Sequence, residues 1–122
     1  MTSVFAYRAP TDEDKVHLAA LQRGFIAIER LLKADQLVYI FGDLETEERL
    51  ALQRGLTELN AAVVEHVPDG HERDSALLKL RLSYECVLRQ QYMAALDLLR
   101  ECRSWANAGI VLVREEGAEH VG

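Results

Sequence analysis

Apolar side chains recur every three or four residues over most of the chain, and this spacing predicts amphipathic helices. The first such stretch begins after Thr11, a good N-cap residue, with Asp14 in position to complete a weakened capping box. Acidic residues fill its first turn, which favours the positive end of a helix dipole. The predicted helix carries the apolar stripe Leu18, Leu21, Phe25, Ile28 and Leu32.

The end of this helix is less sharply defined, between Ala34 and Phe41. Residues 37–41 are five consecutive apolar or aromatic residues, and periodicity alone does not separate a buried helical turn from a short strand in such a run. An isolated strand would have no partner in an otherwise helical chain. We therefore favour helix for residues 37–41, with Gly42 as its stop.

A second helix is predicted from the cap residue Asp43 to Val67, where Pro68-Asp69-Gly70 forces a turn. Gly55 interrupts this segment and indicates a place where two helices approach closely. Its apolar stripe consists of Leu52, Leu56, Leu59 and Val63.

Residues 71–116 contain no proline and one glycine, Gly109, and their apolar positions keep a nearly heptad spacing. One unbroken helix of this length would span roughly 60 Å, too long for two shorter helices of the same chain to cover. It therefore either breaks, with Gln90-Gln91 as the candidate, or is shared between subunits. Because the stripe passes Gln90 without a change of phase, we favour the long shared helix.

These patterns together predict an all-α fold, a small bundle of three to four helices with a long C-terminal helix, in a homo-oligomer. We expect a single helical domain over residues 1–122, with an extended arm at 1–10 and a frayed tail at 117–122. A chain of 122 residues is long enough to bury a core without a disulfide or a metal. Cys86 and Cys102 are 16 residues apart on the expected helix, too far for a bridge, and are expected to be reduced thiols.

The net charge of the chain limits the kinds of molecule that it is expected to bind. The formal net charge of −6 argues against DNA or RNA polymers, which need a cationic surface. A small anionic ligand needs only a local group of arginines, so it remains compatible with the total charge. The chain has no stretch apolar enough to span a membrane and no leader sequence, so we expect a cytoplasmic protein without a membrane partner.

The candidate binding residues lie in the arm, where Tyr7 and Arg8 precede the first helix. An aromatic ring beside a guanidinium on an extended segment is suited to stacking and to pairing with an anion. The alternative is structural: Phe5 and Tyr7 hold the arm onto the bundle, and Arg8 and Arg23 form ion pairs with Glu13, Asp14 or Glu29.

Two segments resemble the phage anti-CBASS type 2 family of cyclic-nucleotide sponges: Ala6-Tyr7-Arg8 followed by Thr11 with its acidic turn, and Gln91-Tyr92-Met93-Ala94-Ala95-Leu96. The resemblance implies a compact homo-oligomer that sequesters cyclic dinucleotides or trinucleotides without degrading them. It implies that Tyr7 stacks on a base and that Arg8 and Arg23 contact phosphates. The lysine of that family falls at Gln22, which carries no charge and would instead read a polar edge of the ligand.

Catalytic and metal-binding functions find no support in the pattern. His17, His66, His71 and His120 lack the helical spacing of a ligand set and are expected to be surface residues. No acid, base and nucleophile stand together, so we expect no enzyme and no cofactor. The alternative function is a helical protein-interaction or chaperone module, because the spacing of residues 82–102 is similar to a tetratricopeptide hairpin with Gln90-Gln91 at its turn.

Overall fold

The computed structural model describes residues 5–41 and 46–114, and the side chains of residues 7–33 and 47–112. Four helices lie within these ranges: α1 (Asp12–Phe41), α2 (Thr46–His66), α3 (His71–Leu88) and α4 (Tyr92–Val111). Two short strands, β1 (Phe5–Tyr7) and β2 (Leu112–Arg114), flank them. The prediction of a small all-α bundle is confirmed, and the Gly42 stop, the Asp43 cap and the tail at 117–122 lie outside the described residues.

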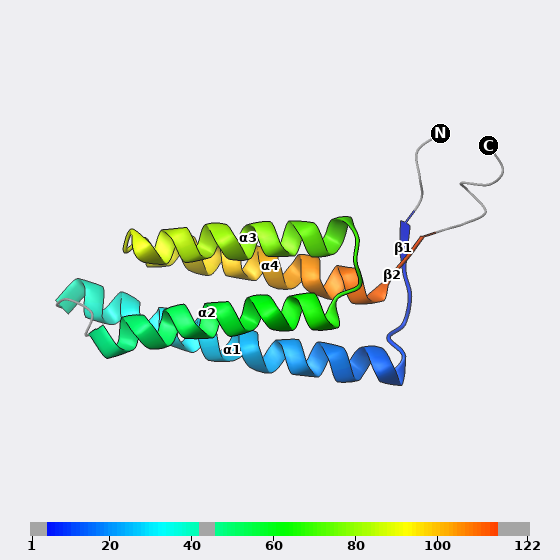
Figure 1. Ribbon diagram of the computed structural model, residues 1–122, viewed down its shortest axis with the longest axis horizontal. Helices are drawn as coiled ribbons and strands as arrows, with labels where there is room; N and C mark the ends of the chain where they lie inside the picture. The colour runs from blue at the N-terminus through cyan, green and yellow to red at the C-terminus, as the bar shows by residue number, and fades with distance from the viewer. Residues whose placement is uncertain (1–4, 42–45, 115–122) are drawn as a thin grey trace.

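The helices alternate in direction, so that α1 and α2 form one antiparallel hairpin and α3 and α4 form the other (Figure 1). Each helix packs against two neighbours: α1 against α2 and α4, and α3 against the same two. One end of the bundle therefore gathers the start of α1, the end of α2, the start of α3, the end of α4 and both strands (Figure 1).

The apolar stripes predicted from the sequence form one core shared by all four helices. Residues 37–41 are helical, as expected, and Pro68-Asp69-Gly70 makes the turn between α2 and α3. Gly55 lies where a β-carbon would collide with the Ile28 side chain, which confirms a close approach of α1 and α2. The largest fully buried side chains on the predicted stripes include Leu21, Phe25, Leu32, Leu52, Leu56, Val63 and Leu99.

The prediction of one long C-terminal helix is wrong, because the chain turns back at residues 89–91. Gln90 has a φ of +60°, the left-handed conformation that usually falls to glycine at a helix end. The Gln91 N–H donates to the Cys86 carbonyl (2.8 Å) and the Gln90 N–H to the Val87 carbonyl (3.0 Å). These two bonds make a Schellman motif with glutamine in the place of glycine.

The hairpin removes the physical reason for sharing a long helix between subunits, because α3 and α4 cover each other within one chain. Ser83 is fully buried and its hydroxyl donates to the Ala95 carbonyl (2.8 Å), which fixes the two helices side by side. The cysteines are free, as predicted, although they stand on separate helices rather than along one. Burial raises the pKa of the Cys102 thiol to about 12.

Residues 5–7 of the N-terminal arm form a strand that has a partner which nothing in the sequence indicated. β1 pairs antiparallel with β2, with Ala6 opposite Val113 and Tyr7 opposite Leu112. β2 occupies part of the segment that was expected to be helical up to residue 116. The pairing holds Tyr7 and Arg8 at one end of the bundle (Figure 1).

Candidate ligand site at the end of the bundle

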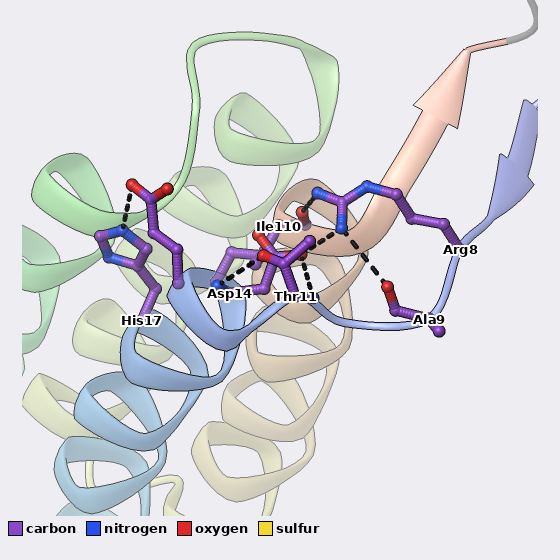
Figure 2. Close-up of polar contacts among 7 residues, drawn as sticks. Arg8, Ala9, Thr11, Asp14, His17 and Ile110 are labelled. Atoms are coloured by element: carbon purple, nitrogen blue, oxygen red, sulfur yellow. Dashed lines mark hydrogen bonds and ion pairs between the residues drawn. The ribbon is translucent and has the colours of Figure 1, made fainter.

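The first turn of α1 is closed by the predicted capping box. The Thr11 N–H donates to the Asp14 carboxylate (3.0 Å), and the Asp14 N–H donates to the Thr11 hydroxyl (3.1 Å). Figure 2 shows both bonds at the point where the arm enters the helix. Because Asp14 is only 9% exposed, its carboxylate is a fixed anion beside the arm.

Arg8 joins the arm to two helices. Its guanidinium pairs with Asp14 on α1 and donates to the Ile110 carbonyl near the end of α4 (3.2 Å), as Figure 2 shows. Its backbone N–H donates to the Val111 carbonyl (3.1 Å). The ion pair considered for Arg8 in the sequence analysis is therefore present.

This ion pair shifts the pKa of both partners. The Arg8 hydrogen bond, followed by the Thr11 N–H, holds the pKa of the Asp14 carboxyl well below its usual range. The same hydrogen bond raises the pKa of Arg8. The Arg8 side chain is nevertheless 37% exposed, so part of the guanidinium remains accessible to solvent.

A cavity of about 730 Å³ opens beside Tyr7 and Arg8. The arm forms one part of its lining, the turn at 68–70 and the start of α3 another, and the end of α4 a third. The Tyr7 side chain is 68% exposed at this cavity. The structure thus places Tyr7 and Arg8 together at a solvent-accessible cavity.

The other two predicted binding residues lie elsewhere. Gln22 lines a separate cavity of about 380 Å³ between α1 and α4, together with Leu18, Arg103 and Asn107. Arg23 is exposed and lines neither cavity. Gln22 is eight residues beyond Asp14 on α1, roughly 12 Å along the helix axis. The structure therefore brings together two of the four predicted residues.

The further side chains that line the cavity of Tyr7 were not predicted to be functional, and they include His71, Glu72 and Trp105. The rings of His71 and Trp105 meet edge to face with their centroids 5.4 Å apart. Trp105 packs against the core but is only half-buried, so part of its ring faces the cavity. Only the turn signal at residues 68–70 hinted at this region, because periodicity does not show which helix ends meet.

Of the histidines expected at the surface, His71 is exposed, His17 and His66 are partly buried against each other, and His120 lies outside the described residues. The Nδ1 atoms of His17 on α1 and His66 on α2 lie 2.7 Å apart, and both rings are partly buried. Within residues 5–41 and 46–114, no group of three or more histidine, cysteine or acidic side chains is placed to hold a metal ion.

No helix in the described part of the chain is both long and apolar enough to cross a membrane. No family model, curated protein or solved structure matches this chain.

Proposed function

We propose that this protein binds a cyclic oligonucleotide second messenger in the cavity at the end of the bundle, and sequesters it without turnover. In this role it would antagonise a bacterial anti-phage signalling system. The observation that carries the proposal is an aromatic ring, Tyr7, which is 68% exposed beside an arginine at the cavity. Such a pair supplies stacking and phosphate contact, and sequestration needs no catalytic group.

Tyr7 contributes the stacking surface in this proposal. Its ring is held on a paired strand rather than on a loose arm, so little conformational freedom is lost on binding. Stacking on a base contributes roughly 1 to 3 kcal/mol.

Arg8 contributes the phosphate contact. Asp14 and the Ile110 carbonyl fix the position of its guanidinium, and a guanidinium carries five N–H donors, more than these contacts use. Because Asp14 offsets much of its charge, we expect a hydrogen-bonded phosphate contact of moderate strength rather than a strong anion trap. Gln22 and Arg23 have no part in this site.

We further propose that the protein binds its ligand as a homo-oligomer, because the ligand itself is symmetric. A cyclic dinucleotide carries two bases and two phosphates related by a two-fold axis, so two copies that each supply one Tyr7 and one Arg8 match it. The cavity is open to solvent beside Tyr7, where a second copy could close it.

Calorimetry with cyclic dinucleotides and trinucleotides tests the proposal. We expect binding heat with the wild-type protein, strong loss of affinity in Tyr7→Ala, and retention in Tyr7→Phe, which keeps the ring. Gln22→Ala is the matched control, because Gln22 lines the other cavity. The ligand should be recovered intact after heating, and light scattering should give a mass above one chain of 13.8 kDa.

The outcome that contradicts the proposal is equally direct. If a well-folded sample gives no heat with any cyclic oligonucleotide, the proposal is wrong. Equal affinity in wild type and Tyr7→Ala would place the ligand elsewhere on the molecule.

A second candidate function, a helical protein-interaction module, rests on the groove between α2 and α3. This groove of about 240 Å³ has an apolar floor that includes Leu56, Leu80 and Tyr84. Apolar grooves of this kind accept an amphipathic helix. A monomer that is stabilised by a protein partner, and not by nucleotides, would favour this candidate.

A further inference from the structure

The cavity at the end of the bundle contains an acidic side chain, Glu72, in the first turn of α3. A β-carbon built on Gly109 would lie 3.1 Å from the Glu72 β-carbon, and one built on Gly70 would lie 3.5 Å from its Oε2 atom. The Glu72 side chain therefore lies next to two glycines, Gly70 before α3 and Gly109 near the end of α4, and neither glycine has a side chain that would crowd it. The carboxylate therefore lies along the wall of the cavity.

The other charged groups of the cavity are already paired within the chain. Arg8 is bound to Asp14, and Asp69 accepts a hydrogen bond from Arg73 (2.8 Å). Among the charged side chains described at this cavity, the Glu72 carboxylate has no hydrogen bond or ion pair with the protein. A ligand that displaces water from the Glu72 carboxylate keeps it hydrogen-bonded only if the ligand brings donors, since a carboxylate only accepts.

We propose that Glu72 selects a guanine base, with the ring stacked on the aromatic side chains of the cavity. This inference rests on the proposed function, because it names the base within the same ligand class. Guanine carries two adjacent donors on one edge, the N1–H and the N2 amino group, which match the two oxygens of a carboxylate. Adenine has an acceptor at N1 and one donor group, the N6 amino group, on the corresponding edge. Its N1 lone pair would therefore face a carboxylate oxygen that cannot donate to it.

Trp105 provides the second aromatic surface of this site. It comes from α4, whereas Tyr7 comes from the arm, so the two rings belong to different walls of the cavity. His71 meets the Trp105 ring edge to face and holds its orientation. Because Trp105 is the single tryptophan of the chain, its fluorescence reports directly on a base that enters the cavity.

The test compares cyclic diguanylate with cyclic diadenylate on the full chain, by calorimetry and Trp105 fluorescence. Since a good two-bond contact to a base gives discrimination of about 10- to 100-fold, we expect that preference for the guanine ligand. Glu72→Gln keeps the size of the side chain but puts an amide donor against the donors of guanine. We expect it to lower guanine affinity at least tenfold and to leave adenine affinity unchanged or higher.

Asp74→Asn is the matched control, because it removes an acid from the same first turn of α3 at an exposed position outside the cavity lining. It alters the charge at the helix N-terminus by the same amount as Glu72→Gln. We expect it to leave the base preference intact. A folded Glu72→Gln protein with unchanged guanine affinity would overturn the inference.

The experiment also separates this inference from the proposed function. Cyclic dinucleotides that bind equally well whatever their base would overturn the role of Glu72 and leave sequestration standing. Guanosine monophosphate that binds and is weakened by Glu72→Gln, with no binding of any cyclic oligonucleotide, would keep the guanine site and overturn the proposed function. If only cyclic diadenylate or another adenine ligand binds a folded sample, the guanine site is wrong and sequestration stands. If neither a guanine compound nor any cyclic oligonucleotide binds, both are wrong.

Discussion

Asp14 is the residue on which the arm and α1 depend together. It completes the capping box with Thr11 and pairs with Arg8, which in turn reaches Ile110 across 102 positions of sequence. The capping box was predictable, because its two partners are three residues apart. The contact between Arg8 and the Ile110 carbonyl was not predictable, because the two residues are far apart in the sequence and no local pattern shows that they meet.

At this scale we predict that Asp14→Asn makes the protein less stable at neutral pH and less sensitive to acid. The pKa of Asp14 is lowered by folding, so its stabilising contribution is complete above its unfolded pKa of about 3.9. That contribution is lost as the pH falls below this value. The gap in melting temperature between wild type and variant should therefore be largest near neutral pH and narrow below about pH 4.

Asp12→Asn is the control for this experiment, because it removes one charge from the same helical turn without touching the Arg8 pair. Thermal unfolding followed by circular dichroism over a pH series gives the measurement. A gap between wild type and Asp14→Asn that stays constant from neutral pH into acid would contradict the prediction.

At the scale of the element, the break between α3 and α4 requires Gln90 to adopt a backbone conformation that is unfavourable for a residue with a side chain. Gln90 adopts a left-handed conformation, which costs a residue with a β-carbon roughly 1 kcal/mol or more. The Schellman hydrogen bonds on either side of it and the packing of α3 on α4 outweigh this cost. The turn is therefore stabilised by local backbone hydrogen bonds and by the packing of α4 on α3, without a glycine or a proline at the break.

We predict that Gln90→Gly raises the free energy of unfolding by about 1 kcal/mol, because glycine adopts this conformation without strain. For a domain of this size that is a rise in melting temperature of about 4 °C. Gln91→Gly is the matched control, since its φ of −96° suits any residue and glycine there only adds freedom to the unfolded chain. Urea unfolding of the two variants checks the difference, and a less stable Gln90→Gly would contradict it.

The helices also show why part of the fold could not be predicted from the sequence. The stripes on α1 and α2 were predictable because burial repeats with the helical period, and Leu52, Leu56, Leu59 and Val63 are all buried. The break at Gln90 leaves that period in phase and carries no glycine or proline, so local signals favoured one long helix. The cavity was missed for a related reason: Glu72 and Trp105 come together only because α4 folds back along α3, which brings the end of α4 to the start of α3.

At the scale of the whole molecule, the two hairpins share one core and are expected to unfold together. Ile28 on α1 is 3% exposed and packs against α2 beside Gly55, whereas Trp105 reports from α4 in the other hairpin. Since α1 packs directly against both α2 and α4, a defect in the first hairpin lowers the stability of the second. The molecule is in this sense one cooperative unit rather than two hairpins in contact.

We predict that Ile28→Val, which removes one buried methylene, costs about 1 kcal/mol and lowers the melting temperature by about 4 °C. The shift should be the same whether unfolding is followed by circular dichroism, which reports on all helices, or by the fluorescence of Trp105. Val16→Ala, on the same helix but at a side chain 66% exposed, should leave both transitions nearly unchanged. If Ile28→Val lowered the transition temperature seen by dichroism and left that seen by Trp105 fluorescence unchanged, the two hairpins would unfold separately. In that case a ligand bound at the end of the bundle where both hairpins meet would be expected to couple their unfolding.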